Sequence, residues 1–241
     1  MITGASRGLG RAMAISLSTA GATVALVARD TKKLESVRRE LEEAGGRAGV
    51  FPADVTQEDD VARVARDAAA QLGPVQILIN NAGINIRKQV VDFSLAEWRQ
   101  VMDTNHTSAF LMCRAVVPQM RGTGFGRVLN IASTMAHVSI PMRAAYSSSK
   151  AALLGLTRAL ALELAADGIT VNSISPGPIA TEMNTVLLEN PEANRQFLAN
   201  VPLGRWGRPE EPGSLACYLC SEEAGFITGA DFLIDGGWCA R

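Results

Sequence analysis

The chain has 241 residues, of which 47% are hydrophobic and 20% charged, so it can bury a sizeable core and is not a disordered protein. Its 23 basic and 24 acidic side chains leave a net charge of −1, which disfavours a nucleic-acid partner. No uninterrupted apolar stretch approaches the ~18 residues of a membrane span, and no secretory signal is visible. We therefore expect a cytoplasmic protein with no membrane or nucleic-acid partner.

Short β-branched runs alternate with longer helical patterns, which is typical of a parallel sheet with crossover helices. The runs are apolar nearly throughout, as expected for strands buried on both faces. Strands are predicted at Thr23–Ala28, Gly49–Ala53, Val75–Ile79, Arg127–Ile131, Ile169–Ile174 and Asp231–Ile234. The predicted helices are one on Leu9, Met13 and Leu17, one on Leu34, Val37 and Leu41, one from a Ser94/Glu97 capping box toward Met120, and one from Tyr146 to Ala166.

The stretch from Ser175 to Pro212 is rich in proline and glycine and shows no regular pattern. Long irregular stretches of compact domains are usually functional, so we expect a substrate lid around residues 176–212. No repeat or linker divides the chain, which predicts one domain over residues 1–241.

A glycine-rich loop, Thr3–Gly10, stands directly before the first predicted helix. Its glycines allow a tight turn and a close approach of the backbone to a pyrophosphate, which the helix N-terminus attracts. The next predicted strand ends in Ala28-Arg29, where NAD-selective folds place an acidic residue. Arg29 and the loop residue Arg7 instead suit a 2′-phosphate, because arginine binds phosphate through bidentate hydrogen bonds. We therefore predict NADP(H) as the cofactor.

Tyr146 and Lys150 lie four residues apart and so share one face of a predicted helix. A neighbouring ammonium favours the phenolate and is expected to lower the pKa of Tyr146 from its usual value near ~10. The phenol would then serve as proton donor and acceptor for an alcohol–carbonyl pair.

The glycine loop and the Tyr146/Lys150 pair, together with further motifs in the same order, resemble the short-chain dehydrogenase/reductase family over essentially the whole chain. The further motifs are Asp54-Val55, Asn80-Asn81-Ala82-Gly83, Asn105, Ser133, Pro176-Gly177 with Thr181, and Asp235-Gly236-Gly237. The resemblance implies an α/β, single-domain Rossmann fold, with a doubly wound parallel sheet of about seven strands and helices on both faces. It also implies a homotetramer.

Hydride transfer between nicotinamide and a substrate carbon is the activity that this resemblance implies. Tyr146 would be the acid or base, Lys150 would lower its pKa and hold the nicotinamide ribose, and Ser133 would hydrogen-bond the carbonyl oxygen. Asn105 would bend its helix and hold a water that relays protons to Lys150. The implied cofactor-binding residues are Gly4, Ser6, Arg7, Gly8, Leu9, Gly10, Arg29, Asp54, Val55, Asn81, Ala82, Gly83, Tyr146, Lys150, Pro176, Gly177, Ile179 and Thr181.

The substrate is left open between 3-oxoacyl chains on acyl carrier protein and sugar acids of the gluconate kind. His137 falls where the family lines its substrate pocket, Arg87 would contact an anion as in gluconate-type members, and Met183 would provide apolar pocket or lid surface. A catalytically silent dinucleotide-binding sensor is the alternative, although it should lack one of the four catalytic groups. No metal site is expected, and Cys217 and Cys220 are interpreted as core residues.

Only Met1, Ile2 and Thr3 precede Gly4, although the first strand of such a sheet is central and strands usually run about five or six residues. The first strand therefore looks truncated. We expect a native chain that extends upstream, with Met1 inside that strand.

Overall fold

The computed structural model describes residues 1–240, apart from the side chains of Met183 and Val186, and within these residues seven parallel strands form one sheet. The spatial order is β3-β2-β1-β4-β5-β6-β7, which confirms the predicted doubly wound Rossmann topology. The strands are β1 (Ile2–Thr3), β2 (Thr23–Ala28), β3 (Arg47–Pro52), β4 (Ile77–Asn80), β5 (Gly126–Ile131), β6 (Ile169–Pro176) and β7 (Asp231–Ile234).

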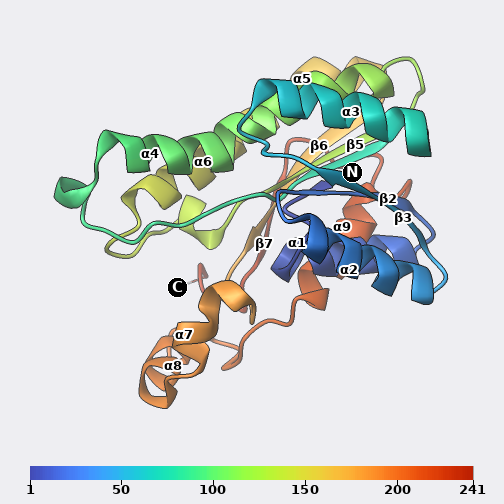
Figure 1. The fold of residues 1–241 in the computed structure, drawn as a ribbon. Coiled ribbons are helices and arrows are strands. Elements are labelled where there is room, and N and C mark those ends of the chain that lie inside the picture. The colour runs from blue at the N-terminus through green and yellow to red at the C-terminus, as the bar shows by residue number, and fades with distance from the viewer. Residues whose placement is uncertain (241) are drawn as a thin grey trace.

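Helices cover both faces of the sheet (Figure 1). On one face lie α3 (Glu58–Leu72), α5 (Ser108–Met120) and α6 (Ala144–Leu164), and on the other lie α1 (Gly8–Thr19), α2 (Thr31–Glu43) and α9 (Glu210–Cys220). The helix α4 (Leu95–Met102) packs on α6, whereas α7 (Thr185–Leu188) and α8 (Pro191–Leu198) project from the edge near β7.

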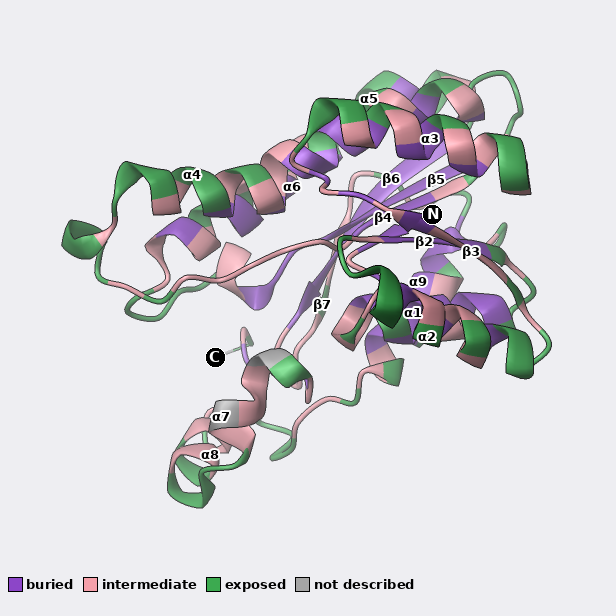
Figure 2. Ribbon diagram, in the orientation of Figure 1, coloured by how far each residue is buried: buried purple, intermediate pink, exposed green. Residues whose placement is uncertain are grey.

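The core has two layers because successive strand residues point to opposite faces of the sheet. Leu78 and Val128 belong to the cluster under α3 and α5, whereas their neighbours Ile79 and Leu129 belong to the cluster under α1, α2 and α9. Figure 2 shows the strands as the most continuously buried part of the molecule, with α7 and α8 far more exposed.

The short strand β1 occupies the centre of this sheet. Ile2 and Thr3 pair with Leu26 and Val27 of β2, and Ile2 also pairs with Ile79 of β4. The strand therefore delivers the glycine-rich loop to the carboxyl edge of the sheet, where parallel α/β folds bind their ligands.

The helix predicted from Ser94 toward Met120 is present. The capping box at Ser94 is present, but the helix is divided into α4, a π-helical turn at Asp103–Thr107, and α5. The helix α3 was not predicted from the sequence at all.

The stretch from Ser175 to Pro212 is more regular than predicted. The strand β6 runs on to Pro176, and α7, α8 and the start of α9 fall within this stretch. The helix α8 forms because Asn190 accepts a hydrogen bond from the Ala193 amide at 3.0 Å and Pro191 occupies the first helical position.

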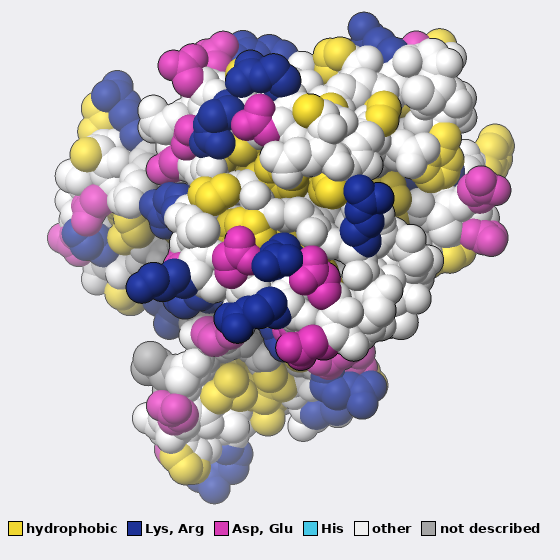
Figure 3. All heavy atoms as spheres, turned by 45° about the vertical axis from the view of Figure 1, so that its right-hand side comes forward, with side chains coloured by type: hydrophobic (Ala, Val, Ile, Leu, Met, Phe, Trp, Pro, Cys, Tyr) yellow, Lys and Arg dark blue, Asp and Glu magenta, His cyan; other side chains and the backbone are white. Residues whose placement is uncertain are grey.

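Charges of both signs are interspersed on the face shown in Figure 3, in keeping with the balanced composition. Among the described residues, no helix combines the length and apolar character needed to cross a membrane.

Candidate active site

The glycine-rich loop between β1 and α1 is built for close backbone approach. Gly4 has φ +65°, and a Cβ added at Gly10 would lie 2.2 Å from the Gly4 carbonyl oxygen, so a side chain there would collide with the loop. The first turn of α1 contains no acidic residue. The loop therefore presents bare backbone and a helix N-terminus, which together can hold a phosphate group.

Asn81 fastens this loop to the end of β4. Its side-chain nitrogen donates to the Thr3 carbonyl at 2.9 Å, and its backbone amide donates to the Thr3 hydroxyl at 2.9 Å. The amide of Ala82 donates to the same hydroxyl at 3.0 Å. The predicted glycine loop and the predicted Asn80–Gly83 turn are thus one hydrogen-bonded unit.

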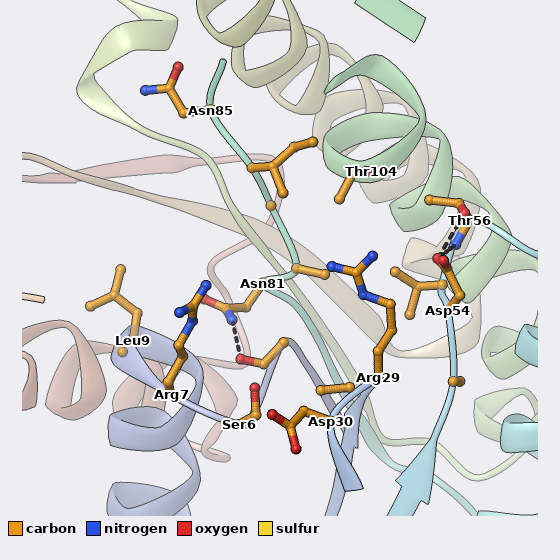
Figure 4. Close-up of a pocket in the computed structure, with 18 of the residues that line it drawn as sticks. Ser6, Arg7, Leu9, Arg29, Asp30, Asp54, Thr56, Asn81, Asn85 and Thr104 are labelled. Carbon is orange, nitrogen blue, oxygen red and sulfur yellow. Dashed lines mark hydrogen bonds between the residues drawn. The ribbon is translucent and has the colours of Figure 1, made fainter. Parts of the chain in front are cut away.

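A cavity of about 940 Å³ opens beside this unit (Figure 4). Arg7 and Arg29 both extend into it, from the glycine loop and from the end of β2 respectively. Most of the predicted cofactor residues line it, namely Gly4, Ser6, Arg7, Gly8, Leu9, Arg29, Asp54, Val55, Asn81, Ala82, Gly83 and Thr181. Gly10 does not line the cavity but allows the turn of the loop, because a side chain at this position would collide with Gly4.

Asp30 also lines this cavity and was missed by the sequence reasoning, which stopped at Arg29. Its carboxylate caps α2 by accepting from the Lys33 amide at 3.1 Å, and it forms an ion pair with the Lys33 ammonium at 3.5 Å. The backbone hydrogen bond to Lys33 is the main cause that lowers the pKa of Asp30. A helix-capping signal at Asp30 was available in the sequence.

A second cavity, of about 520 Å³, continues from the first. The two share Leu9, Asn81, Gly83, Asn85, Arg87 and Thr181 in their linings, so they form one cleft with two ends. Ser133, Tyr146 and Lys150 line the second cavity, together with Pro176, Gly177 and Ile179. The structure therefore brings three of the four predicted catalytic side chains into the lining of one cavity.

Burial raises the pKa of the Tyr146 phenol, and this effect is opposed by a hydrogen bond with Ser133 and by the positive charge of Arg143. The predicted effect of Lys150 on this pKa is not found. The ammonium of Lys150 lies 5.8 Å from the centre of the tyrosine ring and donates to the Ile131 carbonyl at 2.7 Å. Burial lowers the pKa of Lys150 itself to about 8, because an ammonium in this environment has lost most of its hydration.

Asn105 lies behind the cavity rather than in its lining, in the π-helical turn at Asp103–Thr107. The regular α-helical hydrogen bonding is therefore interrupted at the position where a bend was predicted. The side-chain nitrogen donates to the Ile84 carbonyl and to the Ser149 hydroxyl, each at 2.9 Å, and the side-chain oxygen accepts from the Ile84 amide at 2.8 Å. Asn105 thus ties the loop after β4 to α6, the helix that carries Tyr146 and Lys150.

The three predicted substrate residues have different outcomes. Arg87 lines both cavities, whereas the side chain of Met183 lies outside the described residues. His137 is not among the lining residues of either cavity, so its role as a substrate contact stays a prediction. Its Nε2 lies 2.6 Å from a carboxylate oxygen of Asp231, the first residue of β7, whose other oxygen accepts from the hydroxyls of Ser173 and Ser175.

The second cavity also contains Arg143 and Phe197, which the sequence did not reveal. Arg143 reaches it from the start of α6. Phe197 of α8 stacks on Trp206 with ring centres 5.1 Å apart and contacts Trp238 with ring centres 5.0 Å apart. These side chains come from segments far apart in the sequence, so no local spacing could have grouped them. Within the described residues, no cluster of His, Cys, Asp and Glu side chains has the makings of a metal site.

A model of the family described as "Enoyl-(Acyl carrier protein) reductase" matches residues 4–239. The chain is 35% identical over 237 residues to gluconate 5-dehydrogenase of Gluconobacter oxydans, with 98% of this chain and 93% of that protein covered. The chain belongs to the short-chain dehydrogenase/reductase family.

Two further members of the family show the range of this similarity. The chain is 34% identical over 238 residues to a 3-oxoacyl-(acyl-carrier-protein) reductase of Staphylococcus aureus, covering 98% of this chain and 96% of that protein. A crystal structure of a putative NAD(P) dependent gluconate 5-dehydrogenase from Beutenbergia cavernae, with bound NADP at low occupancy, matches with a TM-score of 0.94 and 37% identity. That match covers 100% of this chain and 96% of the other. As a member of this family, the chain is an oxidoreductase that uses a nicotinamide cofactor.

Proposed function

We propose that this oxidoreductase transfers a hydride between NADP(H) and a small carbonyl or secondary-alcohol substrate. The observation that carries the proposal is the continuous cleft, with the glycine-rich loop at one end and Ser133, Tyr146 and Lys150 together in the lining of the other. A cofactor bound along this cleft would be held by its phosphates at the loop and would extend toward Tyr146.

The preference for NADP(H) rests on Arg7 and Arg29, whose guanidinium groups extend into the first cavity. Neither arginine forms an ion pair with a carboxylate of the described residues, and Asp30 is engaged by α2 and Lys33. Two free guanidinium groups match the charge and geometry of a 2′-phosphate. The residues present therefore fit NADP(H), and the NADP-bound relative from Beutenbergia cavernae is in keeping with this assignment.

When bound, the nicotinamide supplies or accepts the hydride. In the reducing direction, Tyr146 gives its phenolic proton to the carbonyl oxygen, and in the oxidising direction it takes that proton back. Ser133 donates a hydrogen bond to the same oxygen and stabilises its developing charge. Lys150, with a pKa of about 8, can exchange a proton near neutral pH and so restore the protonation state of the phenol.

Asn105 acts as a positioning residue in this proposal. Both hydrogens of its side-chain amide are used by Ile84 and Ser149, so a relay water could bind this residue only by donating to one of its carbonyl oxygens. The amide keeps the loop after β4 in place against α6, and with it the positions of Tyr146 and Lys150.

The segment around residues 176–212 is proposed to be a lid over the second cavity. Ile179, Asn184, Leu187 and Phe197 of this segment contribute to the lining, and α7 and α8 extend away from the sheet. Opening of this segment would admit the substrate, and closure would exclude water during hydride transfer.

A homotetramer is proposed from the family, and two apolar side chains on helices outside the cleft are compatible with it. Phe110 of α5 is 46% exposed and Leu162 of α6 is 84% exposed. Light scattering coupled to size-exclusion chromatography measures the mass directly, and a monomeric mass would contradict the proposal.

The test of the function is a screen of NADPH oxidation over keto acids, keto-sugar acids and 3-oxoacyl thioesters, repeated with NADH. We expect NADPH-dependent turnover in at least one class. Binding of NADPH without hydride transfer to any of them would contradict the proposed activity.

A further inference from the structure

The cavity at Tyr146 contains an excess of positive charge. Arg87, Arg143 and Lys150 contribute to its lining, and the part of that lining that the structure describes includes no aspartate or glutamate. The chain as a whole has a net charge of −1, so this excess is local. Lys150 has a role in proton transfer, which leaves the two arginines to be explained.

Arginines elsewhere on the molecule are commonly neutralised by carboxylates. Arg38 pairs with Glu35 and Glu42, each at 2.7 Å, and Lys88, the residue after Arg87, pairs with Glu97. Other described pairs are Arg11–Glu40, Arg63–Asp60, Arg121–Asp167 and Arg205–Glu211. Among the described residues, neither Arg87 nor Arg143 has a carboxylate partner.

Arg143 stands at the N-cap of α6, three residues before Tyr146, and is partly buried. The hydrogen bond described for its guanidinium joins Nη1 to the Met142 carbonyl at 3.3 Å, which leaves other N–H groups free to bind a ligand. The first turn of α6 has no acidic residue and no side-chain cap, so the partial positive charge of the helix N-terminus adds to that of the guanidinium.

The guanidinium of Arg143 remains charged but has lost part of its hydration in the folded protein. Burial, and secondly the charge of Arg87, lower its pKa. A half-buried cation beside a second cation is stabilised when an anion binds between or beside them, because the anion replaces the lost hydration. A neutral acyl chain would cover the partly buried Arg143 without compensating its charge, whereas the exposed Arg87 keeps its contact with water.

We propose that Arg143, together with Arg87, binds a carboxylate of the substrate, and that this chain acts on small hydroxy or keto acids in preference to their neutral counterparts. This inference rests on the proposed hydride transfer and specifies the substrate of the same site. The planar guanidinium matches a carboxylate through two parallel hydrogen bonds. Arg143 would hold the acid end of the substrate beside Tyr146, which acts on its hydroxyl or carbonyl oxygen.

The test compares D-gluconate with D-glucitol, which carries a hydroxymethyl group in place of the carboxylate on the same polyhydroxy chain. A second pair is 3-hydroxybutyrate and its methyl ester. We expect Arg143→Gln to lower kcat/KM for the acids by about 10- to 100-fold, mainly through KM, as for other lost hydrogen bonds between charged groups. The charge of Arg143 also acts on the pKa of Tyr146, so the substitution can change turnover of every substrate. The neutral substrates measure this general change. The ratio of kcat/KM for the acid to kcat/KM for its neutral counterpart then reports carboxylate binding alone.

Two variants serve as controls. Arg143→Lys keeps the charge without the planar fork and should retain part of the acid preference. Arg158→Gln removes an exposed arginine from the same helix α6, away from the cavity, and should leave the ratio unchanged. If Arg143→Gln folds poorly, the acid and neutral substrates are compared in Arg143→Lys and Arg87→Gln instead.

Equilibrium binding separates this inference from the proposed function. Each pair is titrated into the enzyme without cofactor, so that no turnover occurs, and binding is followed by tryptophan fluorescence, to which Trp206 and Trp238 of the cavity lining contribute. Selective binding of the acids that is lost in Arg143→Gln supports the inference even if no turnover is seen, in which case the proposed function fails alone. Equal binding or turnover of acid and neutral compounds by the unmodified enzyme overturns the inference and leaves the hydride transfer intact.

Discussion

The glycine-lined cavity takes nearly all of its lining from residues 4–104, with Thr181 and Glu182 as the exceptions. The cavity at Tyr146 draws instead on residues from Leu9 to Trp238, including the Ser133 turn, α6, α8 and the end of the chain. One end of the cleft is therefore assembled from neighbouring segments, and the other from segments that meet only in the folded molecule.

The two ends also differ in charge. The first cavity mixes signs, with Asp30, Asp54 and Glu182 alongside Arg7 and Arg29. The second contains arginine and lysine without a described carboxylate. A mixed lining suits a cofactor with phosphates, hydroxyls and rings, whereas a lining of one sign selects an anionic ligand. Changes at one end should therefore affect one ligand and spare the other.

The largest expected effect is that of Tyr146→Phe, which removes the phenolic proton while keeping the ring. Turnover should fall by about a thousand-fold, within the range for loss of general acid–base catalysis. Affinity for NADPH, measured by fluorescence titration, should be unchanged because the phosphate-binding end is untouched. Substantial residual hydride transfer would contradict the role assigned to Tyr146.

Lys150 should make stability depend on pH. It is 4% exposed, and its pKa is about 8 in the folded state, against about 10.5 for the unfolded chain. Between these values the unfolded chain binds more protons, so the free energy of unfolding should rise with pH from about 8 to about 10.5. The full rise corresponds to about 3 kcal/mol.

Denaturant unfolding at a series of pH values measures this rise, and Lys150→Met is the control. The variant lacks the titrating group and should not show the increase. Parallel curves for the two proteins between pH 8 and 10 would mean that the ammonium is not destabilised by burial.

Arg29→Asp changes the cofactor end alone. It replaces a cation in the first cavity by an anion, so affinity for NADPH should fall by about 100-fold through lost charge-assisted hydrogen bonds, with a far smaller change for NADH. Dissociation constants of the variant and the unmodified enzyme for NADPH and NADH test whether Arg29 binds the 2′-phosphate. Equal losses would remove the argument for a 2′-phosphate at this position.

The smallest effect is expected in the lid. Without ligands, amides of residues 181–205 should exchange hydrogen faster than those of β5, because α7 and α8 are short and contain no buried residue among those described, whereas β5 is buried throughout. Cofactor and substrate together should slow that exchange. Protection equal to that of β5 in the free protein would argue against a lid.

The sheet could be predicted because each strand carries its own signal. Six apolar runs lie within three residues of the observed boundaries, and the glycine loop marked the place of the first strand. The pairing of Tyr146 with Lys150 was equally local, because a spacing of four residues places both side chains on one face of α6.

Features that depend on distant partners were not predicted. His137 follows Ser133 closely in the sequence, yet its ring turns to Asp231, which lies 94 residues further along the chain. Arg143 drew no attention, although its position near Arg87 and Tyr146 makes it the side chain on which the substrate inference depends. Arg143 matters for the substrate inference because no carboxylate of the described residues pairs with it. Which side chains lie near Arg143 is set by three-dimensional packing.

The sequence by itself determined a parallel sheet with crossover helices, the glycine-rich turn before the first helix and the shared helical face of Tyr146 and Lys150, since these depend on periodicity, glycine conformation and helical spacing. Only the tertiary structure decided which charges remain unpaired at the substrate end, how Asn105 ties two elements together, and which aromatic side chains close the cavity. The reason is physical: charge compensation and burial are set by which side chains meet in space, whatever their separation in the chain.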